Sequence, residues 1–202
     1  MIITEIRPLK KGKYALYLDG EYALSLDKLI VERENLCVND SVDEDYLDGL
    51  KSDSDVVRAK EKALYLLEYR ARTAKELMDK LTPVFGEDAA ECAVQRMEEL
   101  GLIDDEAFAR DYARTLLFSK KISPKSAVYE LMKKGIERDL AEEIIDELEC
   151  DEQEQIRQII DRKYIRCLDD EKGRKRTING LRAKGYCWSD IQTVLNEYDS
   201  SV

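Results

Sequence analysis

The sequence predicts a mainly α-helical protein, built of tandem three-helix repeats in an elongated array, with a small N-terminal β-hairpin extension. Composition is the first reason. The 202 residues include only three prolines and nine glycines, and 38% are charged beside 44% that are hydrophobic, a balance that favours amphipathic helices over disorder. The second reason is a repeat, because LMKKGI at 131–136 returns fifty residues later as LRAKGY at 181–186. The third is an alternation of charge with a similar period.

Residues 13–26 (KYALYLDGEYALSL) predict a β-hairpin. Apolar residues alternate on both sides of Asp19 and Gly20. An Asp-Gly pair suits a two-residue type I′ turn, in which both central residues have positive φ. Because an isolated hairpin is marginally stable in water, we expect support from a third strand at 2–7 or from helices.

Two short helices and a linker are expected after the hairpin. The helices are predicted near 27–34 and 42–50, and the second opens with a capping box that starts at Ser41. The polar run KSDSD at 51–55 is interpreted as a linker. These elements together define a predicted N-terminal domain, residues 1–55.

From about residue 56 the apolar pattern becomes helical and occurs three times. A period of 50 superposes three apolar positions, Leu81, Leu131 and Leu181. The same period superposes three candidate helix caps, Thr73, Ser123 and Gly173, of which the glycine is the weakest cap. A unit of about 50 residues barely buries a core alone, so we expect neighbouring units to stack.

Each unit is predicted to contain three helices. The first helices are expected at 57–70, 105–119 and 152–168. The second helices begin at the caps, and two of them end at Gly135 and Gly185, because glycine adopts the left-handed C′ conformation most readily. The third helices begin at Asp88, Asp139 and Asp190. The predicted repeat domains are residues 56–104, 105–150 and 151–202.

The net charge of −11 conceals a strong alternation along the chain. Residues 162–186 carry nine basic and three acidic side chains, whereas residues 139–155 carry nine acidic and none that is basic. First and second helices are therefore mostly basic, and third helices acidic. The predicted partner-binding residues follow the basic segments: Arg70, Arg72, Lys75, Lys120, Lys121, Lys125, Lys133, Lys134, Arg174, Lys175, Arg176, Arg182 and Lys184.

Two interpretations of these charges remain open at this point. A single charged residue is usually part of a solvated helix face. The segment 172–186 is different, because five basic residues within 174–184 repel one another, and a phosphate backbone or an acidic protein face would relieve that repulsion. The neighbouring Tyr186 and Trp188 are expected to pack in the core, with contact to a partner as the alternative.

The sequence offers little for catalysis. It contains no histidine, which excludes Ser-His and Cys-His pairs, and it has no phosphate-binding glycine motif and no metal-spaced cysteine set. Asp104 and Asp105 resemble a metal-binding or acid–base pair, but they lie between predicted helices, where aspartate caps a helix N-terminus. We therefore expect no enzymatic activity, no metal and no cofactor.

Cysteine usage and hydropathy indicate a cytoplasmic protein. The five cysteines form no CxxC pair and are expected to be reduced thiols. No stretch has the roughly 18 consecutive apolar residues of a membrane span, and the N-terminus lacks the apolar core of a signal peptide.

Several segments together resemble the RecX regulatory proteins of bacteria. The most specific are GLIDDEAFA at 101–109 and the helix endings ELMKKGI and LRAKGY, and ALYLLEYRARTAKELMDKL at 63–81 adds to them. The resemblance covers residues 57–198, and the third unit departs from the pattern where Gly173 replaces a hydroxyl cap.

The resemblance implies a curved array of three-helix units that binds RecA, and RecA-bound single-stranded DNA within the filament. It implies a monomeric regulator, active in homologous recombination, DNA repair and the SOS response, that limits filament extension, ATP hydrolysis and strand exchange. The basic residues would then face acidic patches on RecA, filament DNA, or both. RecA is expected as the main partner, because a net charge of −11 opposes independent DNA binding.

Two other classes of function make different predictions. An independent DNA-binding protein, using its three-helix units as helix-turn-helix modules, would bind naked DNA with a steep salt dependence. An enzyme would lose activity on substitution of Asp104 or Asp105 without losing stability.

Overall fold

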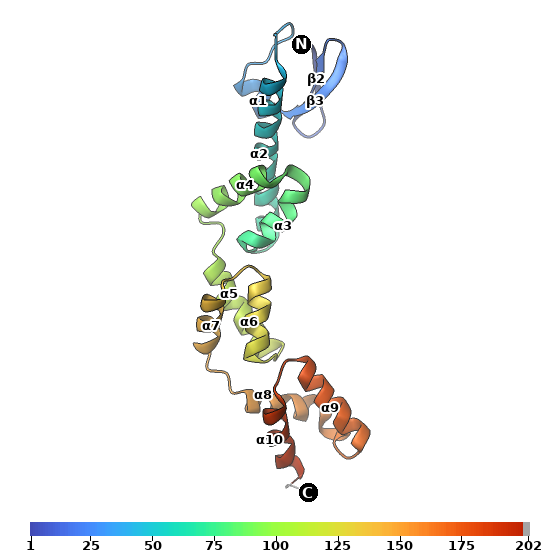
Figure 1. The fold of residues 1–202 in the computed structure, drawn as a ribbon, viewed down its shortest axis with the longest axis vertical. Coiled ribbons are helices and arrows are strands. Elements are labelled where there is room, and N and C mark those ends of the chain that lie inside the picture. The colour runs from blue at the N-terminus through green and yellow to red at the C-terminus, as the bar shows by residue number, and fades with distance from the viewer. Residues whose placement is uncertain (200–202) are drawn as a thin grey trace. The chain divides into compact units, whose positions relative to one another are not determined.

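The computed structural model describes residues 1–199 and divides into two compact units, Met1–Asp104 and Asp105–Val202 (Figure 1). The first unit contains β1 (Ile3–Leu9), β2 (Lys13–Leu18), β3 (Glu21–Asp27), α1 (Lys28–Arg33), α2 (Glu44–Tyr69), α3 (Ala74–Phe85) and α4 (Glu87–Glu99). The second contains α5 (Asp105–Arg114), η1 (Thr115–Ser119), α6 (Pro124–Lys133), α7 (Arg138–Asp146), α8 (Glu152–Ile159), η2 (Ile160–Tyr164), η3 (Ile165–Cys167), α9 (Glu171–Ala183) and α10 (Trp188–Asp199). The predicted mainly helical fold with a small N-terminal sheet is confirmed.

Among the described residues, no helix is both long enough and apolar enough to cross a membrane.

The N-terminal sheet is antiparallel, with strand order β1-β2-β3. Its hairpin turn has φ of 49° at Asp19 and 91° at Gly20, as a type I′ turn requires. The third strand predicted near the N-terminus is β1. Both predictions for the hairpin are therefore confirmed.

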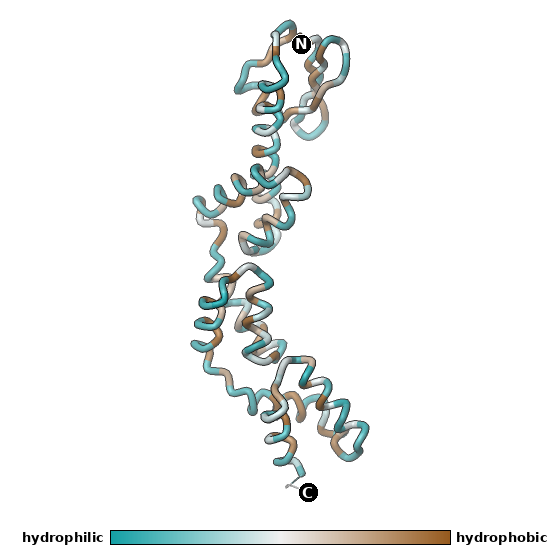
Figure 2. Tube along the Cα trace, in the orientation of Figure 1, coloured by the Kyte–Doolittle hydropathy of each residue, from teal (hydrophilic) through white to brown (hydrophobic). Residues whose placement is uncertain are grey.

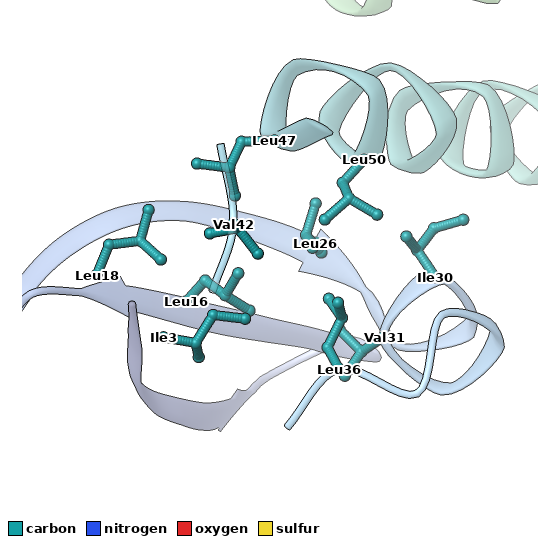
Figure 3. Close-up of a cluster of buried hydrophobic side chains, with 10 residues drawn as sticks. All are labelled: Ile3, Leu16, Leu18, Leu26, Ile30, Val31, Leu36, Val42, Leu47 and Leu50. Carbon is teal, nitrogen blue, oxygen red and sulfur yellow. The ribbon is translucent and has the colours of Figure 1, made fainter. Parts of the chain in front are cut away.

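One face of the sheet packs against α1, α2 and the segment between them. Leu16 and Leu26, both fully buried, lie in a cluster with Leu47 and Leu50 of α2. Figure 3 shows the two α2 leucines on one side of the sheet, with Ile30 of α1 beside them. This helical cover explains how such a small sheet is stable.

Helix α2 corrects the prediction of a short helix, a polar linker and a new helix. It runs unbroken through residues 51–55, so the predicted domain boundary at 55/56 falls inside a helix. The KSDSD run is polar but contains neither glycine nor proline, and its Ser54 is buried, where its hydroxyl accepts a 2.7 Å hydrogen bond from the backbone N–H of Asp27. Packing against the sheet thus keeps this segment helical.

Three helical sets follow one another along the chain: α2–α4, α5–α7 and α8–α10. Each has its own buried cluster, and the aligned leucines of the repeat, Leu81, Leu131 and Leu181, are all fully buried. Figure 2 shows hydrophilic and hydrophobic residues interleaved along the helices, as expected for elements that each bury one face.

The second helices begin at two of the three predicted caps. The hydroxyls of Thr73 and Ser123 accept backbone N–H groups at 3.1 and 3.3 Å. The third prediction is wrong, because α9 begins at Glu171 and its cap is Asp170, whose side chain accepts the N–H of Gly173. Gly173 lies inside the helix, where an added Cβ would meet the carbonyl oxygen of Cys167 at 1.9 Å.

The Lys-Gly endings have the predicted geometry. Gly135 and Gly185 have φ of 94° and 93°. In both cases the glycine N–H and the following N–H bond back to carbonyls of the last turn, at Met132 and Leu131 after α6 and at Arg182 and Leu181 after α9. The repeated motif, LMKKGI at 131–136 and LRAKGY at 181–186, is thus a helix C-terminus whose last carbonyl groups are hydrogen-bonded by the N–H groups that follow.

Candidate partner-binding surfaces

The three predicted residues of the first unit have different environments. Arg72 is buried, and its Nε donates to the carbonyl of Leu66 at 3.2 Å, so it stabilises the α2–α3 turn and is not a surface residue. Arg70 is exposed but pairs with Glu76 at 2.8 Å. Lys75 is exposed on α3.

The basic residues predicted in the second set mostly contact neighbouring side chains. The amine of Lys133 lies 2.7 Å from Glu130 and 4.4 Å from the ring centre of Tyr129. Lys120 and Lys134 lie over the ring of Tyr112 at 5.2 and 5.8 Å. Lys121 donates to Gln158, and Lys125 is exposed.

A polar joint connects the second and third sets. We call it the α6–α9 joint and define it by Ser123, Gln155, Lys184, Gly185 and Tyr186. The backbone N–H of Ser123 donates to the carbonyl of Lys184 at 2.9 Å, so the C-terminal end of α9 meets the N-terminal end of α6. The complementary ends of two helix dipoles meet there.

Lys184 therefore belongs to the α6–α9 joint and not to an open surface. Its amine donates to the carbonyl of Lys120. Partial burial lowers the pKa of Lys184, and the positive charges of Lys163 and Lys121 lower it further. This bond makes Lys184 less accessible to a partner than the exposed cations Arg176 and Arg182.

Arg174 also forms an ion pair within the protein. Its guanidinium makes two hydrogen bonds to the carboxylate of Asp199, at 2.6 and 2.7 Å, which connect α9 to α10. Lys175 pairs with Glu171 one turn away at 2.6 Å. Arg176 and Arg182 are exposed on α9.

The third set carries an open groove with basic walls. We call its cations the α9 cluster: Arg166, Lys172, Lys175 and Arg176. The groove encloses about 530 Å³ and is completed by Cys167, Asp170, Gly173 and Asn179. In the part of the chain that the structure describes, no carboxylate forms an ion pair with Lys172 or Arg176.

The predicted site set omitted two members of the α9 cluster, Arg166 and Lys172. Both lie in the basic segment 162–186, which was a usable signal. Their placement on one groove depends on the short η3 turn, which brings Arg166 back beside the first turn of α9.

Two further predictions concern residues outside the basic set. Tyr186 is 3% exposed and packs in the core as predicted, whereas Trp188 is 49% exposed and does not. Asp104 directly precedes α5, and Asp105 lies in its first turn, where carboxylates interact favourably with the helix dipole.

The Arg174–Asp199 pair is expected to make the docking of α10 sensitive to acid. The guanidinium of Arg174 lowers the pKa of Asp199, so the pair stabilises the fold above the unfolded pKa of about 4 and this contribution is lost as the pH falls through the folded pKa. Thermal melting between pH 7 and 2.5 tests this. Asp199→Asn should be less stable than the wild type at pH 7 and equal to it at the acid end, and a constant difference would contradict the assignment.

Comparison with known proteins agrees with the division into three-helix sets. Residues 59–97 match the family model described as RecX, first three-helix domain, and residues 104–145 match RecX, second three-helix domain. The regulatory protein RecX of Clostridium tetani is 27% identical over 96% of this chain and 91% of its own length. That of Lactobacillus gasseri is 32% identical over 75% of this chain and 56% of its own length.

Two solved structures share the fold. A crystal structure of regulatory protein RecX superposes with a TM-score of 0.63 at 23% identity, covering 96% of this chain and 98% of that one. The crystal structure of RecX from Lactobacillus salivarius gives 0.57 at 28% identity, covering 72% and 97%. Two matched three-helix domains, the full-length similarity to proteins named RecX and the shared fold lead to one conclusion: the chain belongs to the RecX family of regulatory proteins.

Proposed function

We propose that this protein is a non-catalytic regulator that binds RecA and RecA–DNA filaments. In this proposal it inhibits filament extension, ATP hydrolysis and strand exchange in the cytoplasm. Its membership of the RecX family supports a regulatory role. The α9 cluster is the reason for placing the partner-binding surface on the third set. A groove with four cations and one aspartate is suited to an anionic partner.

RecA with its bound DNA is a better candidate for that anion than free DNA. The protein carries a net charge of −11, which disfavours a long-range attraction to naked DNA. A filament repeats the same protein surface many times, and both units of this chain carry exposed cations, among them Lys75 and Arg176. Contacts that are individually weak can therefore add through multivalency.

A titration of the DNA-dependent ATPase of RecA tests the proposal. We expect inhibition by the wild-type protein and co-sedimentation with RecA filaments. Lys172→Glu combined with Arg176→Glu should raise the protein concentration for half-inhibition by about tenfold, because both reversals remove an attraction and add a repulsion. Arg174 is left unchanged, since its reversal would also break its pair with Asp199.

The matched control is Lys51→Glu with Lys80→Glu. Both lysines are exposed in the first unit, so the control changes the net charge by the same amount without touching the α9 cluster. It should inhibit like the wild type. Unchanged hydrolysis at saturating wild-type protein, with no co-sedimentation, would contradict the whole proposal, whereas normal inhibition by the α9 variant would remove only the α9 cluster.

A further inference from the structure

The first unit contains a second cationic groove, which lies between the N-terminal sheet and the helices. It encloses about 430 Å³ and holds none of the residues predicted from the sequence. We call it the sheet–helix groove, and its lining residues are Lys11, Lys13, Asp27, Arg58, Glu61, Lys62, Tyr65 and Phe85. Four of the eight are cations and two are aromatic.

One wall of the groove is a stripe along α2. Arg58, Lys62 and Tyr65 are spaced at i, i+4 and i+7, and Tyr69 continues the stripe at i+11. At 100° per residue, these four side chains leave the helix within an arc of about 60° and extend over roughly 16 Å. Tyr65 is 63% exposed and Tyr69 is 82% exposed. The helix therefore presents two cations followed by two open tyrosines on a single face.

The opposite wall is the turn between β1 and β2. Lys11 and Gly12 both have positive φ, 60° and 65°. The carbonyl of Gly12 accepts the backbone N–H of Lys28 at 2.8 Å, and this bond ties the turn to the start of α1. Lys11 and Lys13 are therefore held beside α2 by backbone structure and do not depend on side-chain pairing.

The charge of the groove remains positive after its internal pairs are considered. Asp27 is engaged as the cap of α1, where it accepts the N–H of Leu29 at 2.9 Å. Arg58 pairs with Asp55 at 3.2 Å and also lies 5.3 Å from the ring centre of Phe85. The lining as a whole holds four cations against two carboxylates, Asp27 and Glu61, so its net charge is positive.

We propose that the sheet–helix groove binds single-stranded nucleic acid. Its lysines contact the phosphates, and Tyr65 stacks on a base, with Lys62 lying 4.6 Å from its ring centre. Cations next to exposed aromatic rings fit a flexible strand, because every base has a face that can stack and every linkage carries a charge. An acidic protein surface would use the same lysines but has no base to stack on Tyr65. This inference goes beyond the proposed function, since it requires neither RecA nor the α9 cluster.

Fluorescence anisotropy of a labelled oligothymidine strand, with the full-length protein at about 20 mM salt and no RecA, tests the proposal. Wild-type binding should weaken with salt with a log–log slope of about −2, for three phosphate contacts. Lys11→Glu with Lys62→Glu should reduce the affinity at least tenfold and flatten that slope. Tyr65→Ala should reduce the affinity at least fivefold, as loss of one stacked base predicts.

Matched controls separate the groove from general effects. Tyr129→Ala removes a tyrosine that is 60% exposed and also has a lysine over its ring, but whose groove on the second set has equal numbers of cations and carboxylates: Lys125, Arg138, Glu142 and Asp146. It should bind like the wild type, as should Lys51→Glu with Lys80→Glu. On a strand of abasic sites, which keeps the phosphates and lacks the bases, Tyr65→Ala should have no effect.

Three results would overturn the assignment. The first is no binding of the wild-type protein at low salt. The second is unchanged binding by both groove variants. The third is an effect of the lysine reversal with none from Tyr65→Ala, together with equal competition by polyglutamate, which would identify an acidic-protein surface instead. The RecA ATPase titration is a separate measurement, so failure of the groove and failure of RecA regulation can be told apart.

Discussion

Gly185→Ala is expected to lower the free energy of unfolding by about 2–4 kcal/mol. Two costs combine at this position. The residue has φ of 93°, which costs a non-glycine residue about 1–2 kcal/mol. The new Cβ would also lie 1.8 Å from the Oγ of Ser126 and 2.6 Å from the Oγ of Ser123.

The overlap cannot be relieved by a simple rotation of Ser126. Its Cβ lies only 2.9 Å from the added atom, and the Oγ of Ser123 is held as the cap of α6. The end of α9 would have to move away from α6, which would lengthen the bond from the Ser123 N–H to the Lys184 carbonyl. Movement of α9 also displaces the α9 cluster, so a weaker inhibition of RecA should accompany the loss of stability.

Urea unfolding followed by circular dichroism measures the effect, and Gly101→Ala is the control. Gly101 has φ of 67° at the end of α4, but an added Cβ would meet nothing within 4 Å. Its substitution should therefore cost only the backbone term, about 1–2 kcal/mol. Equal losses for the two variants would show that the close approach of α9 to α6 does not contribute.

Local signals predicted most of the helix ends, but the capping box predicted at Ser41 is wrong, because α2 begins at Glu44 and its cap is Asp43. Thr73 and Ser123 cap their helices, and Gly135 and Gly185 end theirs with positive φ, because a cap or a C′ glycine acts on backbone groups within four or five residues. Such signals are complete in the sequence itself. The Asp19-Gly20 turn was predictable for the same reason.

Predictions failed where a distant segment decides the local structure. The run at 51–55 has the composition of a linker, yet it is helical because Ser54 packs against the strand that ends at Asp27. The prediction at Gly173 failed for a local reason instead: it aligned with two hydroxyl caps, but Asp170, three residues earlier, supplies a better cap. The repeat period of the sequence predicts neither the helix through 51–55 nor the cap at Asp170.

The availability of the predicted basic residues was the least predictable feature. Arg174 has its partner 25 residues away on α10, and Lys184 has its acceptor 64 residues away. Arg72 is buried against its own turn. The sheet–helix groove was missed for a related reason, since Lys11 and Lys62 are far apart in sequence and only the fold brings their segments together. The sequence shows which residues are charged, whereas tertiary packing determines which of these side chains stay accessible to a partner.

The α6–α9 joint also depends on a buried polar network around Gln155. This side chain is 6% exposed. Its Nε2 donates to the carbonyl of Leu117 at 2.9 Å, and its Oε1 accepts from the hydroxyl of Tyr186 at 2.7 Å. The Tyr186 hydroxyl also lies 3.1 Å from the carbonyl of Lys121. Burial raises the pKa of Tyr186 well above its usual range, so the hydroxyl keeps its proton and remains a donor.

Gln155→Leu is therefore expected to lower the free energy of unfolding by about 2–4 kcal/mol, since it leaves the Leu117 carbonyl unpaired and weakens the bonding of Tyr186. Tyr186→Phe alone should cost about 1 kcal/mol. The double variant should cost less than the sum of the two by about 1 kcal/mol, because the two side chains share one hydrogen bond. Urea unfolding of the wild type, the two single variants and the double variant completes the cycle. Strictly additive losses would mean that this bond does not stabilise the joint.

The RecA ATPase titration on the same four proteins tests whether the orientation of the α9 cluster depends on the joint. Inhibition should weaken in the order of the lost stability. Full inhibition by a folded Gln155→Leu variant would contradict that dependence.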